Sequence, residues 1–114
     1  MKMAVEPVAA GVVKVILDGR LDISGAGTID LQFSAIAASH RGVLVDMSDV
    51  SFLASMGIRT LLLAAKAVQR RGGAFILLHP SPEVSRVLEV TGVSDLMPIC
   101  RDNDAALAAE SAPA

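Results

Sequence analysis

The chain has 114 residues, of which 53% are hydrophobic and 19% are charged, and its formal net charge is -2. This composition is typical of one globular domain and excludes a disordered chain. Aromatic residues make up only 3%, with no Trp or Tyr, so stacking platforms for bases or sugars are nearly absent. Because no run of cations offers a footprint for phosphates either, we expect no direct nucleic-acid partner.

The sequence predicts neither a secretory leader nor a membrane contact. No basic segment precedes an apolar one near the start, and the apolar runs end well short of the ~20 residues that a membrane span needs. We therefore expect a cytoplasmic location. Cys100 is the only cysteine and the two His residues lie far apart, so we expect no disulfide, metal site or cofactor.

Two strands are predicted at the start of the chain. Residues 1–10 predict an edge strand that is interrupted at Pro7. The β-branched run at 12–19 lies between glycines and predicts a second strand. The short glycine turn between them predicts an antiparallel pair.

A helix and a third strand follow. The helix is predicted over about 25–39, with either Asp22 or Ser24 as its N-cap. The apolar run at 43–47 predicts a strand covered by neighbours, and we expect residues 48–54 to connect it to the next helix.

Strands and helices also alternate in the second half of the chain. This alternation predicts crossover connections and a largely parallel inner sheet, hence an α/β fold. The predicted elements are a helix from Ser55 to Arg71 stopped by Gly72 and Gly73, a strand at 74–79, a helix at 81–92 capped by Ser81, a short strand at 96–100 and a helix at 102–110.

The helix predicted from Ser55 has two different faces, because successive residues rotate by about 100° around the axis. One face is apolar and predicts a core contact. The opposite stripe mixes apolar and cationic side chains, so it is either a solvated face or a docking surface. The core face holds Ile58, Leu61, Leu62, Ala65 and Val68, and the stripe holds Met56, Arg59, Leu63, Lys66, Ala67 and Arg70.

Ser55 lies at the start of this helix and permits two roles. As an N-cap it would satisfy an amide of the first turn, which stabilises a helix by about 1 kcal/mol. A helix N-terminus also tolerates a phosphate dianion, and Arg59 lies one turn further on, within reach of it. A phosphate on Ser55 would add nearly two negative charges to the stripe, and so could change binding without changing the fold.

Catalysis is not expected, because no nucleophile and base can be paired from the residues present. Asp22 and Asp46 are expected at or near the carboxyl ends of strands, where ligands collect in open α/β sheets. A small-ligand site there, with Ser55, stays open as an alternative, but the chain has no glycine-rich phosphate loop.

Three segments, "DGRLDIS", "VLVDMSDVSFLASMGIRTLL" and "RRGGAFILLHPSPEVSRVLEVTGVSDLMPI", carry a family resemblance. The chain resembles the STAS domain, in particular the bacterial anti-sigma factor antagonists. The resemblance implies one STAS domain over residues 1–114, with a mixed four- to five-stranded sheet and about four helices packed mainly on one side. We expect its core at about 12–107, with mobile ends at 1–5 and 111–114.

The resemblance also implies a mechanism. In sigma-regulating members, a GHKL-type serine kinase that is also the anti-sigma factor phosphorylates a serine at the head of the second helix, and a PP2C-type phosphatase reverses this. The usual motif, Asp-Ser-Ser/Thr-Gly, reads Ala54-Ser55-Met56-Gly57 here, which makes Ser55 the implied phosphoacceptor. The implied partner-binding residues are Asp22, Ser24, Asp46, Ala54, Met56, Gly57, Arg59, Leu63 and Lys66.

The predicted function is that of a non-enzymatic anti-sigma factor antagonist that acts by partner switching. Only the form with unphosphorylated Ser55 would bind the kinase. The alternative is a constitutive STAS interaction or scaffold subunit, such as a stressosome subunit, a signalling adaptor or a lipid-transport accessory. A homodimer through Met56 and Leu63 also stays open.

Overall fold

Five strands form one sheet in the order β1-β2-β3-β4-β5 in the computed structural model, which describes residues 1–100. β1 is antiparallel to β2, and every other neighbouring pair is parallel. The strands are β1 (Lys2–Ala9), β2 (Val12–Leu21), β3 (Gly42–Leu53), β4 (Ala74–Leu78) and β5 (Ile99–Cys100).

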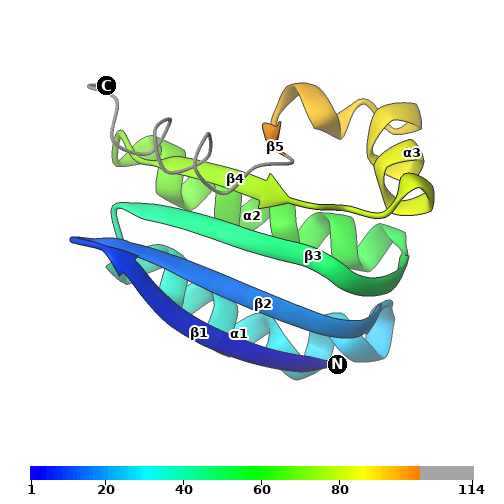
Figure 1. Cartoon of the computed structure of the whole chain (residues 1–114), viewed down its shortest axis with the longest axis horizontal. Helices are drawn as coiled ribbons and strands as arrows, with labels where there is room; N and C mark the ends of the chain where they lie inside the picture. Colours follow the sequence, from blue (N-terminus) through cyan, green and yellow to red (C-terminus); the bar gives the residue numbers. More distant parts are fainter. Residues whose placement is uncertain (101–114) are drawn as a thin grey trace.

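The helices α1 (Ile23–Ser39) and α2 (Ser55–Arg70) cover one face of this sheet, and α3 (Pro82–Val90) lies at its end, beyond β4 (Figure 1). A short 3-10 helix, Val93–Asp95, leads on to β5. The predicted class is confirmed: this is a single α/β domain with a mixed five-stranded sheet. Residues 1–100 contain three α-helices, and the helix predicted at 102–110 lies outside the described residues.

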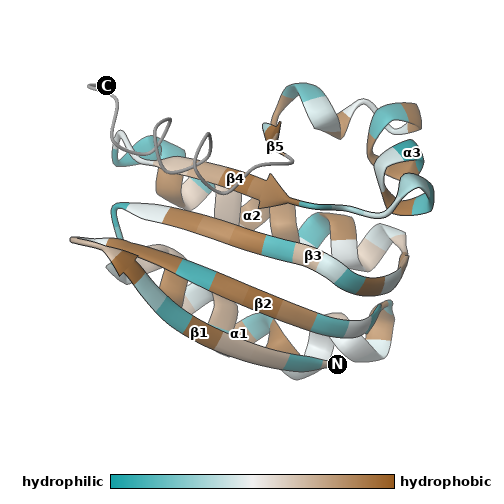
Figure 2. Cartoon of the chain, viewed as in Figure 1, coloured by the Kyte–Doolittle hydropathy of each residue, from teal (hydrophilic) through white to brown (hydrophobic). Residues whose placement is uncertain are grey.

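The main core fills the space between the sheet and the two covering helices. Alternate residues of the inner strands point toward α1 and α2. Residues of the opposite face, such as Leu44 and Ile76, are also apolar, and Figure 2 accordingly shows β2, β3 and β4 as largely hydrophobic bands. Phe33 of α1 meets Phe75 of β4 edge-to-face, with ring centroids 6.2 Å apart. Strand residues of this core include Val13, Val15, Leu17, Val43, Val45, Met47 and Leu77, and helix residues include Ile29, Leu61, Ala65, Val68, Val84 and Leu88.

The prediction that β3 ends at Met47 is wrong, because the strand continues to Leu53. Its second half pairs with the end of β2, which likewise runs past Gly19 to Leu21, and the register shifts twice along this stretch. Polar residues suggested a loop here, but Val50 and Leu53 are buried and hold the strand against the core. Both strands therefore carry the chain directly to the heads of the helices.

β1 is an edge strand, as predicted, and pairs with β2 around a turn in which Gly11 has φ 74°. Pro7 does not end the strand, although the register shifts between Pro7 and Ala9, a deviation that an edge position tolerates. The stretch expected to be mobile, residues 1–5, contributes Met1 and Met3, which pack against the core.

Candidate functional site

The N-terminal ends of α1 and α2, here called their heads, lie side by side at the carboxyl ends of β2 and β3. β2 and β3 end in the paired residues Leu21 and Leu53, and each helix begins two residues later, at Ile23 and Ser55. The amide of Ala54 donates a hydrogen bond of 3.0 Å to the carbonyl of Leu21, which fixes one head beside the other. The two helix N-termini thus bring two positive dipole ends to one place.

A glycine at the third position of each helix permits this close packing. A Cβ on Gly25 would lie 2.1 Å from the backbone oxygen of Arg20, and one on Gly57 would lie 2.3 Å from that of Leu21. Both distances are far below any real contact, so a side chain would push each helix away from β2. Gly57 is buried, and its function in the site is close packing rather than the surface contact that the resemblance implied.

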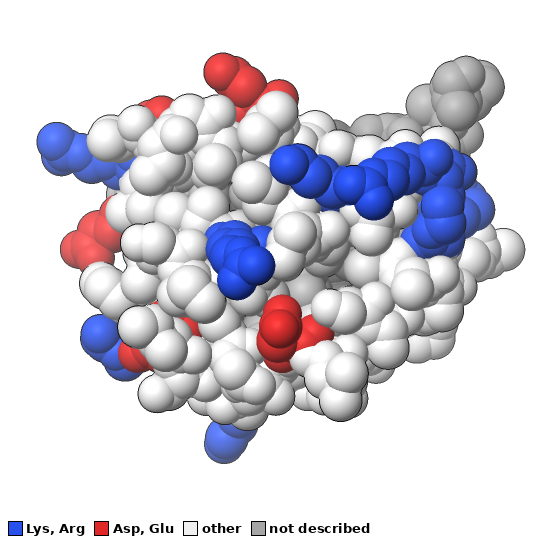
Figure 3. Space-filling model, turned by 180° about the vertical axis from the view of Figure 1, so that it is seen from behind, with Lys and Arg blue, Asp and Glu red and all other residues white. Residues whose placement is uncertain are grey.

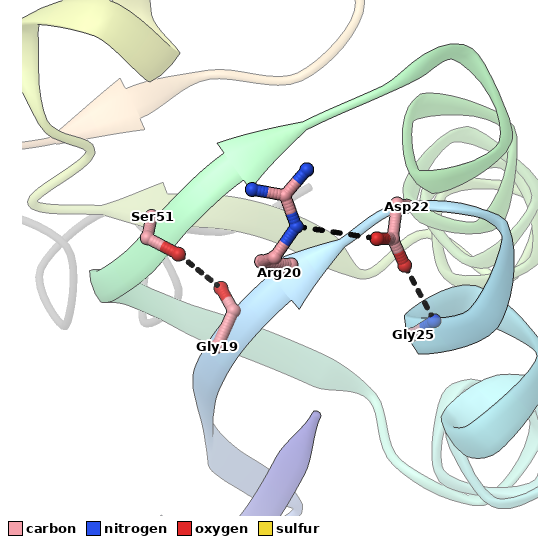
Figure 4. A network of polar contacts seen from close by, with 5 residues as sticks. All are labelled: Gly19, Arg20, Asp22, Gly25 and Ser51. Atoms are coloured by element: carbon pink, nitrogen blue, oxygen red, sulfur yellow. Dashed lines mark hydrogen bonds and ion pairs between the residues drawn. The ribbon is translucent and has the colours of Figure 1, made fainter.

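The head of α1 is capped by Asp22, so of the two predicted caps Asp22 is the correct one and Ser24 is not. One carboxylate oxygen accepts a hydrogen bond of 2.9 Å from the Gly25 amide, and the other lies 3.4 Å from Nε of Arg20 (Figure 4). The Arg20 guanidinium also lies 4.3 Å from the centroid of the Phe52 ring.

The cap favours the charged form of Asp22. The hydrogen bond from the Gly25 amide is the largest influence and lowers the pKa of Asp22. Desolvation opposes this effect, whereas the hydrogen bond and the charge of Arg20 add to it. Asp22 therefore stays an anion at the point where the two helices meet.

The head of α2 is different, because its N-cap is Ala54, which has no side chain that could accept a hydrogen bond. Ser55 is the first helical residue, so the prediction that it caps the helix is wrong. Its side chain is exposed and makes no hydrogen bond with any other residue in the range 1–100. The amides of the first turn have no acceptor within their own helix either.

Asp46 lies away from this site. It is the fifth of twelve residues in β3, so the expectation that it ends a strand and borders Ser55 is wrong. Leu53 lies seven positions further along the strand, a distance of about 23 Å. It lies on the sheet face opposite α1 and α2, beside Lys14 (Nζ–Oδ2 3.7 Å).

The pKa of Asp46 is also lowered. Burial, its largest single influence, would raise it, but the hydroxyl and amide of Ser48 and the charge of Lys14 together outweigh burial. These contacts give Asp46 a structural role in the sheet, as the ion-pair partner of Lys14 and a hydrogen-bond acceptor for Ser48.

The predicted mixed stripe of α2 is exposed. Met56 is 39% and Leu63 is 53% exposed, and Arg59, Lys66 and Arg70 are also exposed. On the core face, Leu61, Ala65 and Val68 are buried as predicted, and Ile58 and Leu62 are half-buried.

A groove of about 340 Å³ lies between α1 and α2, beside the exposed stripe. Its α2 side is formed by Met56, Arg59, Thr60 and Leu63, and its α1 side by Ile23, Ala26, Gly27 and Asp30. Sequence reasoning missed the α1 side. The available signal was Ile23, an apolar residue directly after the cap that is 72% exposed.

Sequence reasoning also missed the pair of Arg20 and Phe52, because both residues were placed in loops. Strand alternation could have found them: Leu21 and Leu53 are buried, so the residues just before them point outward.

The site presents a hydroxyl rather than an activated nucleophile. Among residues 1–100, no side chain that could serve as a base forms a hydrogen bond with Ser55. Within the same range no three His, Cys, Asp or Glu residues group as metal ligands. No helix in this part of the chain is both long and apolar enough to cross a membrane.

Comparisons with known proteins agree with this geometry. The family model of the STAS domain matches residues 4–106. BtrV of Bordetella bronchiseptica, a candidate anti-sigma factor antagonist by name, is 26% identical over 110 residues, or 96% of this chain and 94% of that protein. The anti-sigma-B factor antagonist of Bacillus subtilis is 24% identical over 87 residues, covering 76% of this chain and 80% of that protein. The crystal structure of an anti-sigma factor antagonist from Mycobacterium paratuberculosis superposes with a TM-score of 0.86 at 27% identity, covering 97% of this chain and 94% of that one.

Proposed function

The chain belongs to the STAS domain family, and from this premise we propose that it is an anti-sigma factor antagonist that works by partner switching. In this proposal the unphosphorylated protein binds an anti-sigma factor that is a GHKL-type serine kinase. The kinase phosphorylates Ser55, the complex dissociates, and a PP2C-type phosphatase restores the binding form. The names of the Bacillus subtilis and Bordetella bronchiseptica relatives support the regulatory class.

The observation that carries the proposal is the unoccupied hydroxyl of Ser55 at an uncapped helix head. A hydroxyl that capped its own helix would have to leave that hydrogen bond before it could enter a kinase active site. Ser55 has no such bond within the described chain, and its neighbour Ala54 adds none. The side chain is therefore free to be modified without loss of a structural contact.

The same geometry predicts what a phosphate would do there. The free amides and the positive dipole end of α2 favour an anion, so the fold should tolerate the modification. Asp22, which caps the neighbouring helix head, is also an anion. A phosphate on Ser55 would therefore add to the negative charge that this part of the surface already carries. A partner surface that fits the neutral Ser55 would then meet nearly two additional negative charges.

We infer that the partner contacts the exposed and half-buried residues around this head. The set is Asp22, Ser24, Ala54, Met56, Arg59, Leu63 and Lys66, extended by Ile23 on the α1 side of the groove.

The test uses the purified protein, GHKL-type serine kinases from its own organism and ATP. Mass spectrometry should find one phosphate, on Ser55, and the phosphorylated protein should lose at least tenfold in affinity for the kinase. Ser55→Asp should reproduce that loss. Ser55→Ala should bind and accept no phosphate, and Gln32→Glu, which adds the same charge on the exposed side of α1, should bind normally.

Phosphate on a different residue, or undiminished binding of Ser55→Asp, would contradict the proposal. Constant binding without any phosphorylation would favour the scaffold alternative. Two features of the chain support this second candidate: Ala54 and Met56 stand where the family motif carries an acidic residue and a second hydroxyl.

A further inference from the structure

The charges of α2 are all of one sign. The helix contains no Asp or Glu, and its three charged residues, Arg59, Lys66 and Arg70, are all exposed. The whole chain, by contrast, has a net charge of -2. Neither the Lys14–Asp46 nor the Arg20–Asp22 ion pair includes a cation of α2, and Arg59, Lys66 and Arg70 form no ion pair with another residue in the range 1–100.

These cations form a straight stripe. The spacings of seven and four residues place them on one side of the helix, over a length of about 16 Å. Leu63, which is 53% exposed, lies between Arg59 and Lys66 and borders the groove. Figure 3 views the helix-covered face and shows Lys and Arg side chains gathered in a row at its upper right, with no acidic side chain between them.

Helix stability accounts only for Arg70, which lies in the last turn, where a cation meets the negative end of the helix dipole. Lys66 and Arg70 are four residues apart, a spacing at which like charges destabilise a helix and opposite charges stabilise it. α3 follows the ordinary pattern, because its one cation, Arg86, lies three residues from both Glu83 and Glu89.

Arg71 shows that a cation at this end can have a structural function, because its Nη2 donates a hydrogen bond of 2.7 Å to the carbonyl of His40. Arg70 has no comparable contact among residues 1–100. Neither the helix dipole nor these contacts therefore account for Arg59 and Lys66.

We propose that the stripe Arg59–Leu63–Lys66–Arg70 docks on an acidic surface of the partner protein, with Leu63 entering an apolar pocket between its carboxylates. The inference rests on the proposed function and extends the proposed interface one turn beyond Lys66, to Arg70 at the far end of α2. Charges at such a rim steer the encounter and mainly raise the association rate.

A protein partner fits better than a nucleic acid. Exposed apolar side chains, Met56 and Leu63, alternate with the cations, and an apolar pocket on a protein can cover them, whereas a phosphate backbone cannot. The stripe also gives the switch a second element: a phosphate on Ser55 lies one turn from Arg59 and would neutralise the head of the stripe.

The test measures association and dissociation rates between this protein and the GHKL-type kinase that binds it, by biolayer interferometry at 50 to 300 mM NaCl. The double variant Lys66→Glu/Arg70→Glu should associate about tenfold more slowly at low salt, with a much smaller change in dissociation. The difference from wild type should shrink as salt rises. Arg86→Glu on α3 is the control for a single charge reversal outside the stripe and should associate at the wild-type rate.

The outcomes separate the two proposals. Wild-type rates for the double variant, while Ser55→Asp still blocks binding, would overturn the stripe and leave the switch standing. A slow double variant beside a fully binding Ser55→Asp would support the stripe and contradict the switch. Circular dichroism checks that each variant is folded, and Lys66→Gln/Arg70→Gln repeats the test with neutral side chains. Tighter binding to a 20-base-pair DNA duplex than to the kinase would overturn the inference in favour of a nucleic-acid surface.

Discussion

The heads of α1 and α2 are built almost alike, but they differ in the residue that caps the helix. Each helix begins two residues after a strand, and each has a glycine at its third position because the helix packs on the end of β2. Even the cap residues share a conformation, with φ -105° and ψ -164° at Asp22, and φ -106° and ψ 172° at Ala54. Asp22 has a carboxylate that accepts a hydrogen bond from an amide of α1, whereas Ala54 has only a methyl group.

The difference shows how one fold can hold one helix N-terminus in place with a side-chain cap and leave the neighbouring N-terminus uncapped. At α1 the cap satisfies an amide of the first turn and holds a fixed negative charge. At α2 the equivalent amides and the dipole have no acceptor from the cap residue, and an exposed hydroxyl stands in front of them. The uncapped head is thus the one suited to receive an added anion.

The largest effect should come from the shared glycines. Gly57→Ala should destabilise the fold by about 2 kcal/mol, because its Cβ would overlap the Leu21 carbonyl and the helix must shift. Gly25→Ala should behave alike. Gly27→Ala is the matched control, since nothing lies within 4 Å of its Cβ, and it should stabilise α1 slightly. Urea unfolding measures all three, and an unaffected Gly57→Ala would show that the heads do not need this close packing.

The missing cap should be restorable. Ala54→Asp should raise the free energy of unfolding by about 1 kcal/mol. The new carboxylate can accept a hydrogen bond from the Gly57 amide, as Asp22 accepts one from the Gly25 amide. Ala54→Asn controls for charge, since it caps without an anion. Thermal unfolding in both variants is the measurement, and no gain in either would mean that the head of α2 cannot hold a cap.

The smallest effect concerns acid. The pKa of Asp22 is lower in the folded protein than in the unfolded chain, so its stabilising contribution is complete above its ordinary pKa of 3.8 and is lost as pH falls through the folded value. Wild type should therefore lose stability relative to Asp22→Asn below about pH 4. Urea midpoints between pH 7 and pH 2.5 test this.

Ser24→Ala is the control for the acid series, because Ser24 is the exposed serine that does not cap α1. Its stability should follow that of wild type at every pH. Parallel acid curves for wild type and Asp22→Asn would show that the charge of Asp22 does not stabilise the head of α1.

Local sequence patterns predicted the order of the elements, the antiparallel first pair and the two faces of α2, because each depends on residues a few positions apart. They failed where a distant partner decides the structure. Residues 48–53 read as a loop, yet they form strand because the end of β2 offers them hydrogen bonds.

The candidate site shows the same division. The sequence alone determined that Ser55 starts a helix with cations on its outer stripe, since helical periodicity depends only on spacing. Only the tertiary structure decided that Asp22 stands beside that helix head while Asp46 lies about 23 Å along the strand, because strand pairing sets those positions. It likewise decided that Gly57 is buried, since the end of β2 packs against that turn and no local pattern contains such a contact.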